Sequence, residues 1–305
     1  MKAVRLYEYG SADKLKYELD APDPGYNDNE VLIATTAISI NPIDWKMRSG
    51  AAKERFPVTF PAILGRDVSG LVRAVGAKVT DFKIGDRVMA FGNATYAELV
   101  AVPAADVTHI PDGLDMVDAA ALPLIVNTGD QLVRITCDLK RGDTVLVAGA
   151  AGGVGRVAVH SAKLLGAKVI AGVRTSALDE ARKLGADAVV AIDDPAALQA
   201  LGHVDALADC VGGDTATRLL AHVKDGGICG TVVAPGPDST LYPLVRVLRR
   251  QLVPDAARLR LFAEDVRDGK LAIPIARRMP LADTAEAHAL AEKPGLGGKI
   301  ILMLL

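Results

Sequence analysis

A glycine-rich turn near the middle of the chain constrains the fold more than any other feature. An apolar run, Thr144–Ala148, leads into it, and glycine occupies positions 149, 152, 153 and 155. A helical pattern, Gly153–Leu165, follows directly and ends before a second apolar run, Lys168–Val173. A strand, a tight turn, a helix and a second strand in this order predict one βαβ unit of a parallel sheet.

The same turn is suited to binding a pyrophosphate. Its glycines let the backbone approach the phosphates, while the free N–H groups and the positive dipole end of the helix favour negative charge. In the pattern G-x-G-x-x-G, Ala150 stands at the first glycine, and Gly152 and Gly155 stand at the second and third. The alternative is a tight turn that only packs the helix on the strand. The predicted cofactor-binding residues of the turn are Ala151, Gly152, Gly153 and Val154.

The end of the second strand indicates which dinucleotide binds. An NAD enzyme places Asp or Glu about 20 residues after the turn to bind the ribose 2′-hydroxyl, whereas this chain reads Arg174-Thr175-Ser176 there. No carboxylate in that stretch repels a 2′-phosphate, and the planar guanidinium of Arg174 suits one. NADPH is therefore the predicted cofactor, bound by these three residues. In the alternative, Arg174 is solvated and Ser176 is a helix N-cap, with Asp179 completing a capping box.

Composition narrows the class of protein. The chain has 305 residues, a formal net charge of -2 and a hydrophobic fraction of 50% with 4% aromatics, which fits two domains with aliphatic cores. This charge argues against nucleic acid or an anionic membrane as a partner, and the sequence has no apolar run of about 18 residues. Cys137, Cys210 and Cys229 are scattered and indicate reduced thiols. We therefore expect a cytoplasmic protein.

Two patterns of secondary structure divide the chain. Residues 1–125 hold short runs broken by Gly, Pro and Asp, which predict a β-rich domain, while residues 126–270 alternate strands with helices, which predicts a doubly wound parallel sheet. The tail, 271–305, is expected to return to the first domain, because its terminal strand has no partner of its own. The fold class is therefore α/β, with the ligand site expected between the domains. Later strands of the parallel sheet are expected at Lys168–Val173, Ala188–Ile192, Val204–Asp209 and Ile228–Val233.

Seven segments in a fixed order carry a family resemblance. They are the glycine-rich turn and residues 41–50, 64–70, 79–88, 121–124, 183–187 and 298–302. Together they resemble the zinc-independent quinone oxidoreductase and enone reductase branch of the medium-chain dehydrogenase/reductase superfamily. The resemblance implies a GroES-like catalytic domain, a Rossmann domain, NADPH as cofactor, and two-electron reduction of quinones or α,β-unsaturated carbonyls. It also implies a homodimer formed by pairing Rossmann sheet edges.

The residues argue against a zinc site. A catalytic zinc needs three protein ligands, commonly Cys and His. Zinc-dependent relatives carry Cys near the position of Asp44 and a Gly-His-Glu triplet where this chain has Gly65-Arg66-Asp67. The sequence has no Cys-x-x-Cys pair, and its five histidines are far apart. A metal-free reductase is the prediction.

Lys46 and Asn41 are the predicted catalytic residues. Without a metal, some other group must stabilise the charge that grows on the carbonyl oxygen, and resembling enone reductases with Asn-Pro-x-Asp-aromatic-Lys place this lysine against the cofactor. Lys46 is expected to bind the cofactor or the oxygen, and Asn41 to orient a carbonyl or a ribose hydroxyl. Asp44 is expected to orient Lys46 or to cap the helix that follows. The alternatives are a solvated lysine beside Trp45 and a turn asparagine.

Further contacts with NADPH are expected on the Rossmann domain. Thr128 stands where relatives keep a threonine near the nicotinamide, and the ends of two strands lie where ligands of such sheets bind. An ordinary helix threonine and plain turns are the alternatives. The residues predicted at the strand ends are Val211, Gly212, Val233 and Ala234.

Two rival functions stay open. An enoyl thioester reductase needs a long cleft for the pantetheine arm, and a non-catalytic redox sensor binds NADPH without turnover. A basic stretch, Tyr242–Arg250, is expected to form a helix with one apolar side. The physiological acceptor, whether a quinone or an enone, is not identified by these residues.

Overall fold

The computed structural model describes residues 1–304, which divide into two compact units. One unit combines Met1–Leu124 with the residues from Pro254 onward, and the other is Ile125–Val253. The chain thus returns to the first unit before α8 (Ala256–Arg267) rather than at residue 271. The reason is that α8 packs beside β8 (Val107–His109), where the Arg260 guanidinium donates to the carbonyl oxygen of His109 at 3.0 Å.

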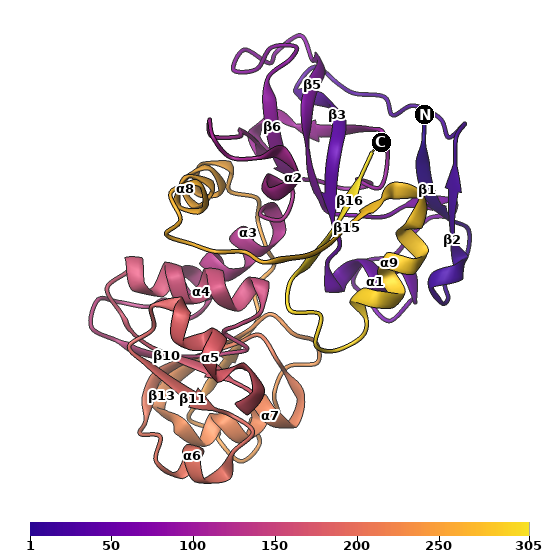
Figure 1. Cartoon of the computed structure of the whole chain (residues 1–305). Helices are drawn as coiled ribbons and strands as arrows, with labels where there is room; N and C mark the ends of the chain where they lie inside the picture. Colours follow the sequence, from indigo (N-terminus) through magenta and orange to yellow (C-terminus); the bar gives the residue numbers. More distant parts are fainter. Residues whose placement is uncertain (305) are drawn as a thin grey trace. The chain divides into compact units, whose positions relative to one another are not determined.

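The first unit is built on two sheets. In spatial order the larger sheet contains β15 (Ile275–Pro280), β16 (Lys299–Met303), β3 (Glu30–Ser39), β5 (Asp67–Val75), β6 (Arg87–Phe91) and β8, with β7 (Leu99–Pro103) also paired to β3. The smaller sheet contains β2 (Leu15–Glu18), β1 (Ala3–Leu6) and β4 (Ala62–Ile63). Leu302 of β16 lies opposite Ile38 of β3 in an antiparallel pair, so the tail completes this unit (Figure 1).

Short helices cover the sheets of the first unit. They are α1 (Pro42–Arg48), α2 (Met116–Ala119), α8 and α9 (Thr284–Ala291). One apolar core cluster joins Leu6 of β1, Ile38 of β3, Leu302 of β16 and the ring of Tyr96, with Ala287 of α9 packed among them. Residues from both ends of the chain therefore share one core with residues of the β-rich domain.

The second unit is one parallel sheet flanked by helices. Its strands, in spatial order, are β11 (Ala188–Ala191), β10 (Lys168–Val173), β9 (Thr144–Ala148), β12 (Val204–Asp209), β13 (Val223–Thr231) and β14 (Arg246–Leu248). Its helices are α3 (Pro123–Gln131, starting at the unit boundary), α4 (Gly153–Leu164), α5 (Leu178–Ala181), α6 (Pro195–Gln199) and α7 (Gly213–Leu219). Because β9 comes first in the chain and lies inside the sheet, the order reverses beside it, as in doubly wound folds.

The position of β9 inside the sheet explains why Thr144–Ala148 is continuously apolar. Val145 and Val147 belong to the core cluster that also holds Val159 of α4, whereas Leu146 belongs to a separate cluster with Leu219 of α7. Successive side chains of a strand point to opposite faces, and both faces of this sheet are covered. The α/β class with a β-rich domain and a doubly wound parallel sheet is confirmed.

The predicted elements agree with the structure except near one edge of the sheet. The predicted bounds of β9, β10 and β12 match the structure, whereas β13 begins at Val223 instead of Ile228. The predicted helix over Tyr242–Arg250 is wrong, since Arg246–Leu248 is the edge strand β14 with Val247 opposite Cys229. Pro243 breaks a helical pattern, and β-branched residues favour pairing with a neighbouring strand.

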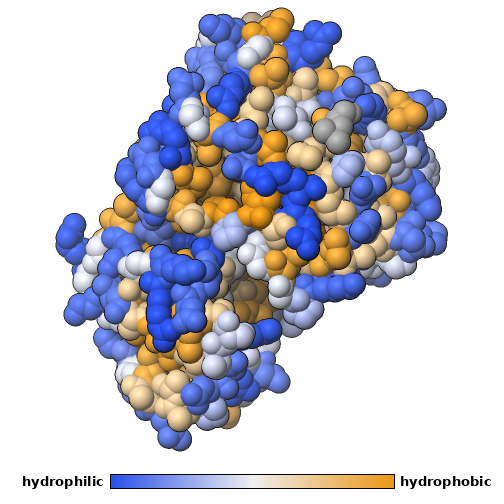
Figure 2. Space-filling model, in the orientation of Figure 1, coloured by the Kyte–Doolittle hydropathy of each residue, from blue (hydrophilic) through white to orange (hydrophobic). Residues whose placement is uncertain are grey.

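The face drawn in Figure 2 shows hydrophilic residues interspersed with apolar ones. Within residues 1–304, no helix has both the length and the apolar character needed to cross a membrane.

Candidate functional site

The glycine-rich turn between β9 and α4 has the backbone geometry of an anion site. A Cβ on Gly155 would overlap the carbonyl oxygen of Gly149, so only glycine allows α4 to start this close to the strand. Gly149 itself has a φ of 80°. Gly152 is the N-cap of α4 and no side chain caps the helix, so the first N–H groups, those of Gly153 and Val154, are presented at an open helix start.

Arg174, Thr175 and Ser176 follow β10 and are all exposed. The structure adds a carboxylate that the local sequence did not indicate. Asp193, which follows β11, accepts hydrogen bonds from the Thr175 backbone nitrogen at 2.8 Å and its hydroxyl at 2.9 Å. These bonds, with the charge of Arg174 nearby, lower the pKa of Asp193.

The alternative reading of Ser176, as a helix N-cap, is not observed. The residue lies inside a 3-10 turn, Thr175–Ala177, whose N-cap is Arg174, and α5 starts only at Leu178 without a side-chain cap. Ser176 therefore keeps its hydroxyl exposed beside Arg174 instead of bonding the backbone of a helix start.

A buried aspartate organises the loops after β12 and β13. Asp209 accepts hydrogen bonds from the backbone nitrogens of Val211 and Gly212, each at 2.9 Å, and from the Thr231 hydroxyl at 2.7 Å. Gly212 has a φ of 71°, and a Cβ there would lie 2.6 Å from Val233. Sequence reasoning named the loops and missed Asp209, although an acidic residue that ends an apolar strand was a visible signal.

The residues predicted to bind the dinucleotide thus gather at one edge of the parallel sheet. Ala151 to Val154 follow β9, Arg174 follows β10, Val211 and Gly212 follow β12, and Val233 and Ala234 follow β13. A Cβ on Gly149 would lie 2.9 Å from Val211, which shows how close the first and third of these loops are. Thr128 is half-buried in α3 of the same unit.

The first unit contains a buried polar network that begins at α1. Asp44 is fully buried, and its Oδ2 accepts from the Asn41 backbone nitrogen at 2.8 Å and from the Tyr96 hydroxyl at 2.9 Å. His288 of α9 lies 3.0 Å from the same hydroxyl through Nε2, and Arg48 lies 3.4 Å from its Nδ1. A neutral His288 that carries its proton on Nε2 satisfies every bond, because Tyr96 then accepts from it and donates to Asp44.

Burial controls the protonation of this network. It raises the pKa of Asp44 to about 7, against the hydrogen bonds from Asn41 and Tyr96, which act to lower it. It lowers the pKa of His288 to about 3, assisted by the positive charge of Arg48. The Oδ1 atom of Asp44 is buried without a hydrogen-bond partner, which fits a carboxyl that is only partly ionised near neutral pH.

A second part of the network centres on Asp67. Its carboxylate accepts from the Leu124 backbone nitrogen at 2.7 Å, from the Asn41 amide at 2.8 Å and from the Ser39 hydroxyl. Lys299 of β16 donates to the Asn41 side-chain oxygen at 2.5 Å, and its Nζ lies 3.8 Å from Asp67. Burial lowers the pKa of Lys299 and raises that of Asp67, while the charge of each opposes the shift of the other.

This geometry changes the role expected of Asn41. The side chain is fully buried, its amide hydrogens point to Asp67 and the Ser39 carbonyl, and its oxygen accepts from Lys299. Asn41 therefore holds the network together and has no free amide hydrogen for a substrate carbonyl. Asp44 accepts from the Asn41 backbone nitrogen at the start of α1, which agrees with its expected role as a helix cap.

Lys46 and Arg66 are two half-buried cations of the same unit that form no ion pair with a residue of 1–304. Lys46 is half-buried on α1, and its ammonium forms no hydrogen bond or ion pair with any described residue. Arg66 precedes β5, and its guanidinium donates to the side chain of Asn93 and lies 3.8 Å from the sulfur of Met47, the residue after Lys46.

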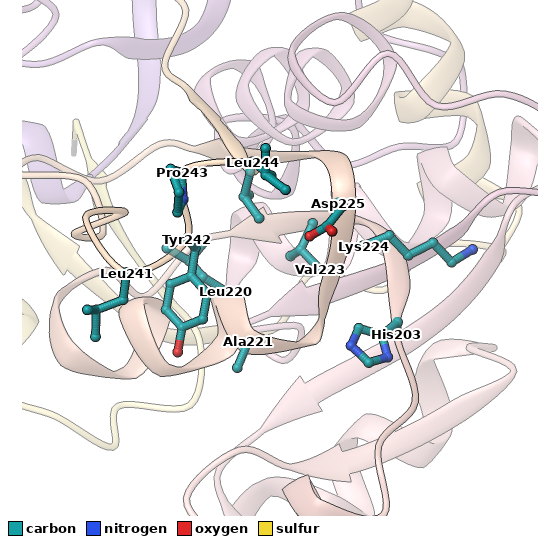
Figure 3. Close-up of a pocket in the computed structure, with 11 residues that line it drawn as sticks. His203, Leu220, Ala221, Val223, Lys224, Asp225, Leu241, Tyr242, Pro243 and Leu244 are labelled. Carbon is teal, nitrogen blue, oxygen red and sulfur yellow. The ribbon is translucent and has the colours of Figure 1, made fainter.

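The second unit also has a cavity of about 680 Å³, drawn in Figure 3. Its wall includes His203, which precedes β12, and Val223, which begins β13, together with the loop residues Leu241 and Leu244. The cavity therefore lies at the amino ends of the strands. Ligands of parallel sheets bind at the carboxyl ends, so this cavity is separate from the predicted dinucleotide site.

The titratable side chains of the described residues do not cluster in the way that a metal site requires. Within residues 1–304, no group of three or more His, Cys, Asp or Glu side chains is arranged to hold a metal ion. The three cysteines are free, and burial raises the pKa of Cys137 to about 12.

The chain is similar in sequence to known dehydrogenases and reductases. Residues 27–112 match the alcohol dehydrogenase GroES-like domain, and residues 184–302 match the zinc-binding dehydrogenase family. A chloroplast envelope quinone oxidoreductase homolog of Arabidopsis thaliana is 31% identical over 99% of this chain and 98% of its own length. An NADPH-dependent alkenal/one oxidoreductase of the same plant is 34% identical over 77% of this chain and 64% of its own length.

The fold is shared with solved structures of the same kind. The quinone oxidoreductase of Coxiella burnetii has 29% sequence identity and a TM-score of 0.91, covering 100% of this chain and 99% of its own. The resemblance expected from the seven sequence segments is confirmed over the full length. The chain belongs to the quinone oxidoreductase branch of the medium-chain dehydrogenase/reductase superfamily.

Proposed function

We propose that the protein is an NADPH-dependent oxidoreductase that transfers a hydride to quinones or α,β-unsaturated carbonyls. The observation that carries the proposal is the open start of α4, where uncapped N–H groups and the Gly152 backbone face the carboxyl edge of the sheet. The names of two relatives, a quinone oxidoreductase homolog and an NADPH-dependent alkenal/one oxidoreductase, support the same chemistry.

The residues of the second unit fit NADPH. The amides of Gly153 and Val154, at the uncapped start of α4, are proposed to bind the pyrophosphate, and the exposed Arg174 is proposed to bind a 2′-phosphate. Asp193 is held by Thr175, so its charge lies beside Arg174 and reduces the local positive field. Bound there, NADPH supplies the hydride.

Calorimetric titration tests this assignment. Replacing Arg174→Ala is expected to weaken NADPH binding roughly 10- to 100-fold, the value of one or two charge-assisted hydrogen bonds, and to leave NADH affinity nearly unchanged. The matched control is Arg182→Ala, because Arg182 is an exposed arginine that pairs with Asp179 on the next turns. Equal loss of NADPH and NADH affinity in Arg174→Ala would contradict a contact with the 2′-phosphate.

The chemistry on the acceptor side is assigned to Lys46. Its unpaired ammonium is proposed to donate to the acceptor oxygen, or to the cofactor, and so to stabilise the negative charge that develops as the hydride arrives. Asn41 and Asp44 position it by fixing the start of α1. Thr128 is proposed to contact the nicotinamide, and water supplies the final proton.

NADPH oxidation with a panel of acceptors tests the activity directly. The panel contains 1,4-benzoquinone, 9,10-phenanthrenequinone, an alkyl vinyl ketone and a 2-alkenal, with NADH as the control donor. Lys46→Ala is expected to lower kcat/KM by about 100-fold, whereas Lys53→Ala, a change at an exposed lysine a few residues further along the chain, is expected to have no effect. Tight NADPH binding without turnover of any acceptor would leave a redox sensor as the better proposal.

We also propose zinc-independent catalysis, a cytoplasmic location and a homodimer. The donor set supports the first, because Arg66 and Asp67 offer no soft or imidazole ligand where a zinc enzyme needs one. The free cysteines support the second. Strand β14 supports the third, since it is an edge strand of the parallel sheet and an exposed edge is a ready site for pairing with another copy. Sedimentation velocity is expected to give twice the chain mass.

A further inference from the structure

Arg66 stands on a segment whose backbone is fixed on both sides. Before it, Gly65 has a φ of 99°, and a Cβ there would overlap the Thr95 hydroxyl and the ring of Tyr96. After it, Asp67 is anchored by the hydrogen bonds already described. The Arg66 carbonyl oxygen accepts from the Gly92 nitrogen at 2.7 Å. The side chain is therefore directed from a rigid base.

The guanidinium of Arg66 lies over two aromatic rings, and the buried carboxyls of Asp44 and Asp67 act on it only through longer-range charge. Its central carbon lies 5.5 Å from the ring centre of Phe56 and 5.8 Å from that of Phe91. Its polar contacts are the side chains of Asn93 and Met47, and no carboxylate of residues 1–304 forms an ion pair with it. An arginine has five N–H donors, so most of them stay available for a bound molecule.

The surrounding charges leave an excess of positive charge here. Lys299 is matched by Asp67, and Arg48 by Glu292 at 2.8 Å. Lys46 has no ion-pair or hydrogen-bond partner among residues 1–304, and Asp44, whose burial raises its pKa to about 7, is only partly ionised near neutral pH. Arg66 and Lys46 are thus two half-buried cations of one unit, and Arg66 contacts α1 at Met47, the residue after Lys46.

We propose that Arg66 is a specificity-determining residue that binds a carboxylate on the acceptor, so that the preferred substrates are quinones or enones carrying an acidic group. A half-buried guanidinium that lies against aromatic rings loses little conformational entropy on binding, because its geometry is already set. Its planar N–H donors match a carboxylate in two parallel hydrogen bonds. The inference rests on the proposed function. The reaction is balanced by one hydride from NADPH, which becomes NADP⁺, and one proton from water, which together convert a quinone to its hydroquinone or an enone to the saturated carbonyl compound.

Matched acid and ester pairs isolate the charge of the acceptor. One pair is 4-oxopent-2-enoate and its methyl ester, and the other is 1,4-naphthoquinone-2-carboxylate and its methyl ester. The wild type is expected to reduce each acid with a kcat/KM at least about tenfold above that of its ester, the value of one charge-assisted hydrogen bond.

Three variants separate charge from packing. Arg66→Met keeps the apolar stem between the two rings and is expected to lower kcat/KM for the acids roughly 10- to 100-fold and leave the esters nearly unchanged. Arg66→Lys keeps the charge without the planar fork and is expected to retain part of the preference. The control is Arg55→Met, because Arg55 is exposed and lies over the same Phe56 ring at 5.1 Å.

The outcomes distinguish this inference from the proposed function. If the wild type reduces acids and esters equally, or if Arg66→Met lowers both equally, the carboxylate assignment is overturned while the oxidoreductase stands. If the wild type reduces none of the four compounds or the acceptor panel, the proposed function fails. Calorimetric binding of the acids and esters then decides the inference by itself: weaker acid binding in Arg66→Met supports it, and unchanged acid binding overturns it.

Discussion

The two units differ in which groups form their sites and in how far apart those groups lie in the sequence. In Ile125–Val253, most groups proposed to bind the cofactor are backbone amides and glycines of loops that directly follow strands, joined by the side chains of Arg174 and Thr128. In the other unit, a network of buried polar side chains converges from strands and helices that are far apart in sequence. Its members are Asn41, Asp44, Asp67, Tyr96, His288 and Lys299.

The difference shows how each unit can fail. A backbone site depends on close approach, so a single methyl group in the wrong place disturbs it. A buried polar network depends on mutual neutralisation, so the removal of one member leaves the others with uncompensated charges or unpaired atoms. Three experiments test whether this contrast holds, beginning with the network.

Removing Lys299 is expected to have the largest effect. Lys299→Met keeps the length of the side chain but leaves the charge of Asp67 buried and without its partner. Breaking such a pair costs about 3–5 kcal/mol of the free energy of unfolding. Urea unfolding followed by circular dichroism measures the loss, and the exposed Lys293→Met serves as the control with an expected change within about 0.5 kcal/mol.

A double variant tests the cause of that loss. In Lys299→Met combined with Asp67→Asn, the uncompensated carboxylate is gone, so part of the lost stability is expected to return. If the double variant is as unstable as the sum of the two single variants, the two side chains are not coupled, and the network is a set of independent hydrogen bonds.

In the second unit, Gly155→Ala is expected to lower the free energy of unfolding by about 1–3 kcal/mol and to abolish NADPH binding. The added Cβ would overlap the Gly149 carbonyl oxygen, and that backbone cannot move without displacing the turn. Gly202→Ala is the matched control in the same unit, since no atom lies within 4 Å of a Cβ built there. Tight NADPH binding by Gly155→Ala would show that the turn is more adaptable than its geometry implies.

The parallel sheet was predictable because its signals are local. The apolar run of β9, the glycines of the turn and the start of α4 occupy consecutive residues, and each is governed by short-range sterics or periodicity. The error at Tyr242–Arg250 has the opposite origin. The pairing of β14 with β13 is a tertiary contact that overrode a local pattern of basic and apolar residues.

The site was predictable to a lesser extent. Lys46 was reached through a short motif, but Lys299 is 258 residues from the Asn41 side chain to which it donates. His288 is fully buried, and its ring lies against the Tyr96 hydroxyl, which is 192 residues away in the sequence. Asp193 reaches Thr175 from the next strand. Such contacts are set by the topology of the sheets, which a window of sequence does not contain.

The smallest predicted effect concerns the pH dependence of the network. Asp44 keeps its proton in the folded state up to its pKa of about 7, against an ordinary value of 3.8, so it makes stability fall as the pH rises between these values. His288 has a folded pKa of about 3 against an ordinary 6.5, so it makes stability rise with pH over that range. Between about pH 4 and 6.5 the two slopes oppose each other, and the wild type is expected to show little net change from this pair.

Single substitutions are expected to uncover the two slopes. In Asp44→Asn the contribution of His288 remains, and the free energy of unfolding should rise relative to wild type by about 1 kcal/mol per pH unit from pH 4 to 6.5. In His288→Gln the contribution of Asp44 remains, and the stability relative to wild type should fall at a similar rate up to about pH 6.5, the ordinary pKa of the lost histidine. Taking differences from wild type removes the shared effects of Arg48, Asp67 and Lys299, and the exposed His203→Gln gives the baseline. Slopes of the same sign in both variants would show that Asp44 and His288 do not share a proton-dependent network, and the contrast between a backbone unit and a side-chain unit would then rest on Lys299 alone.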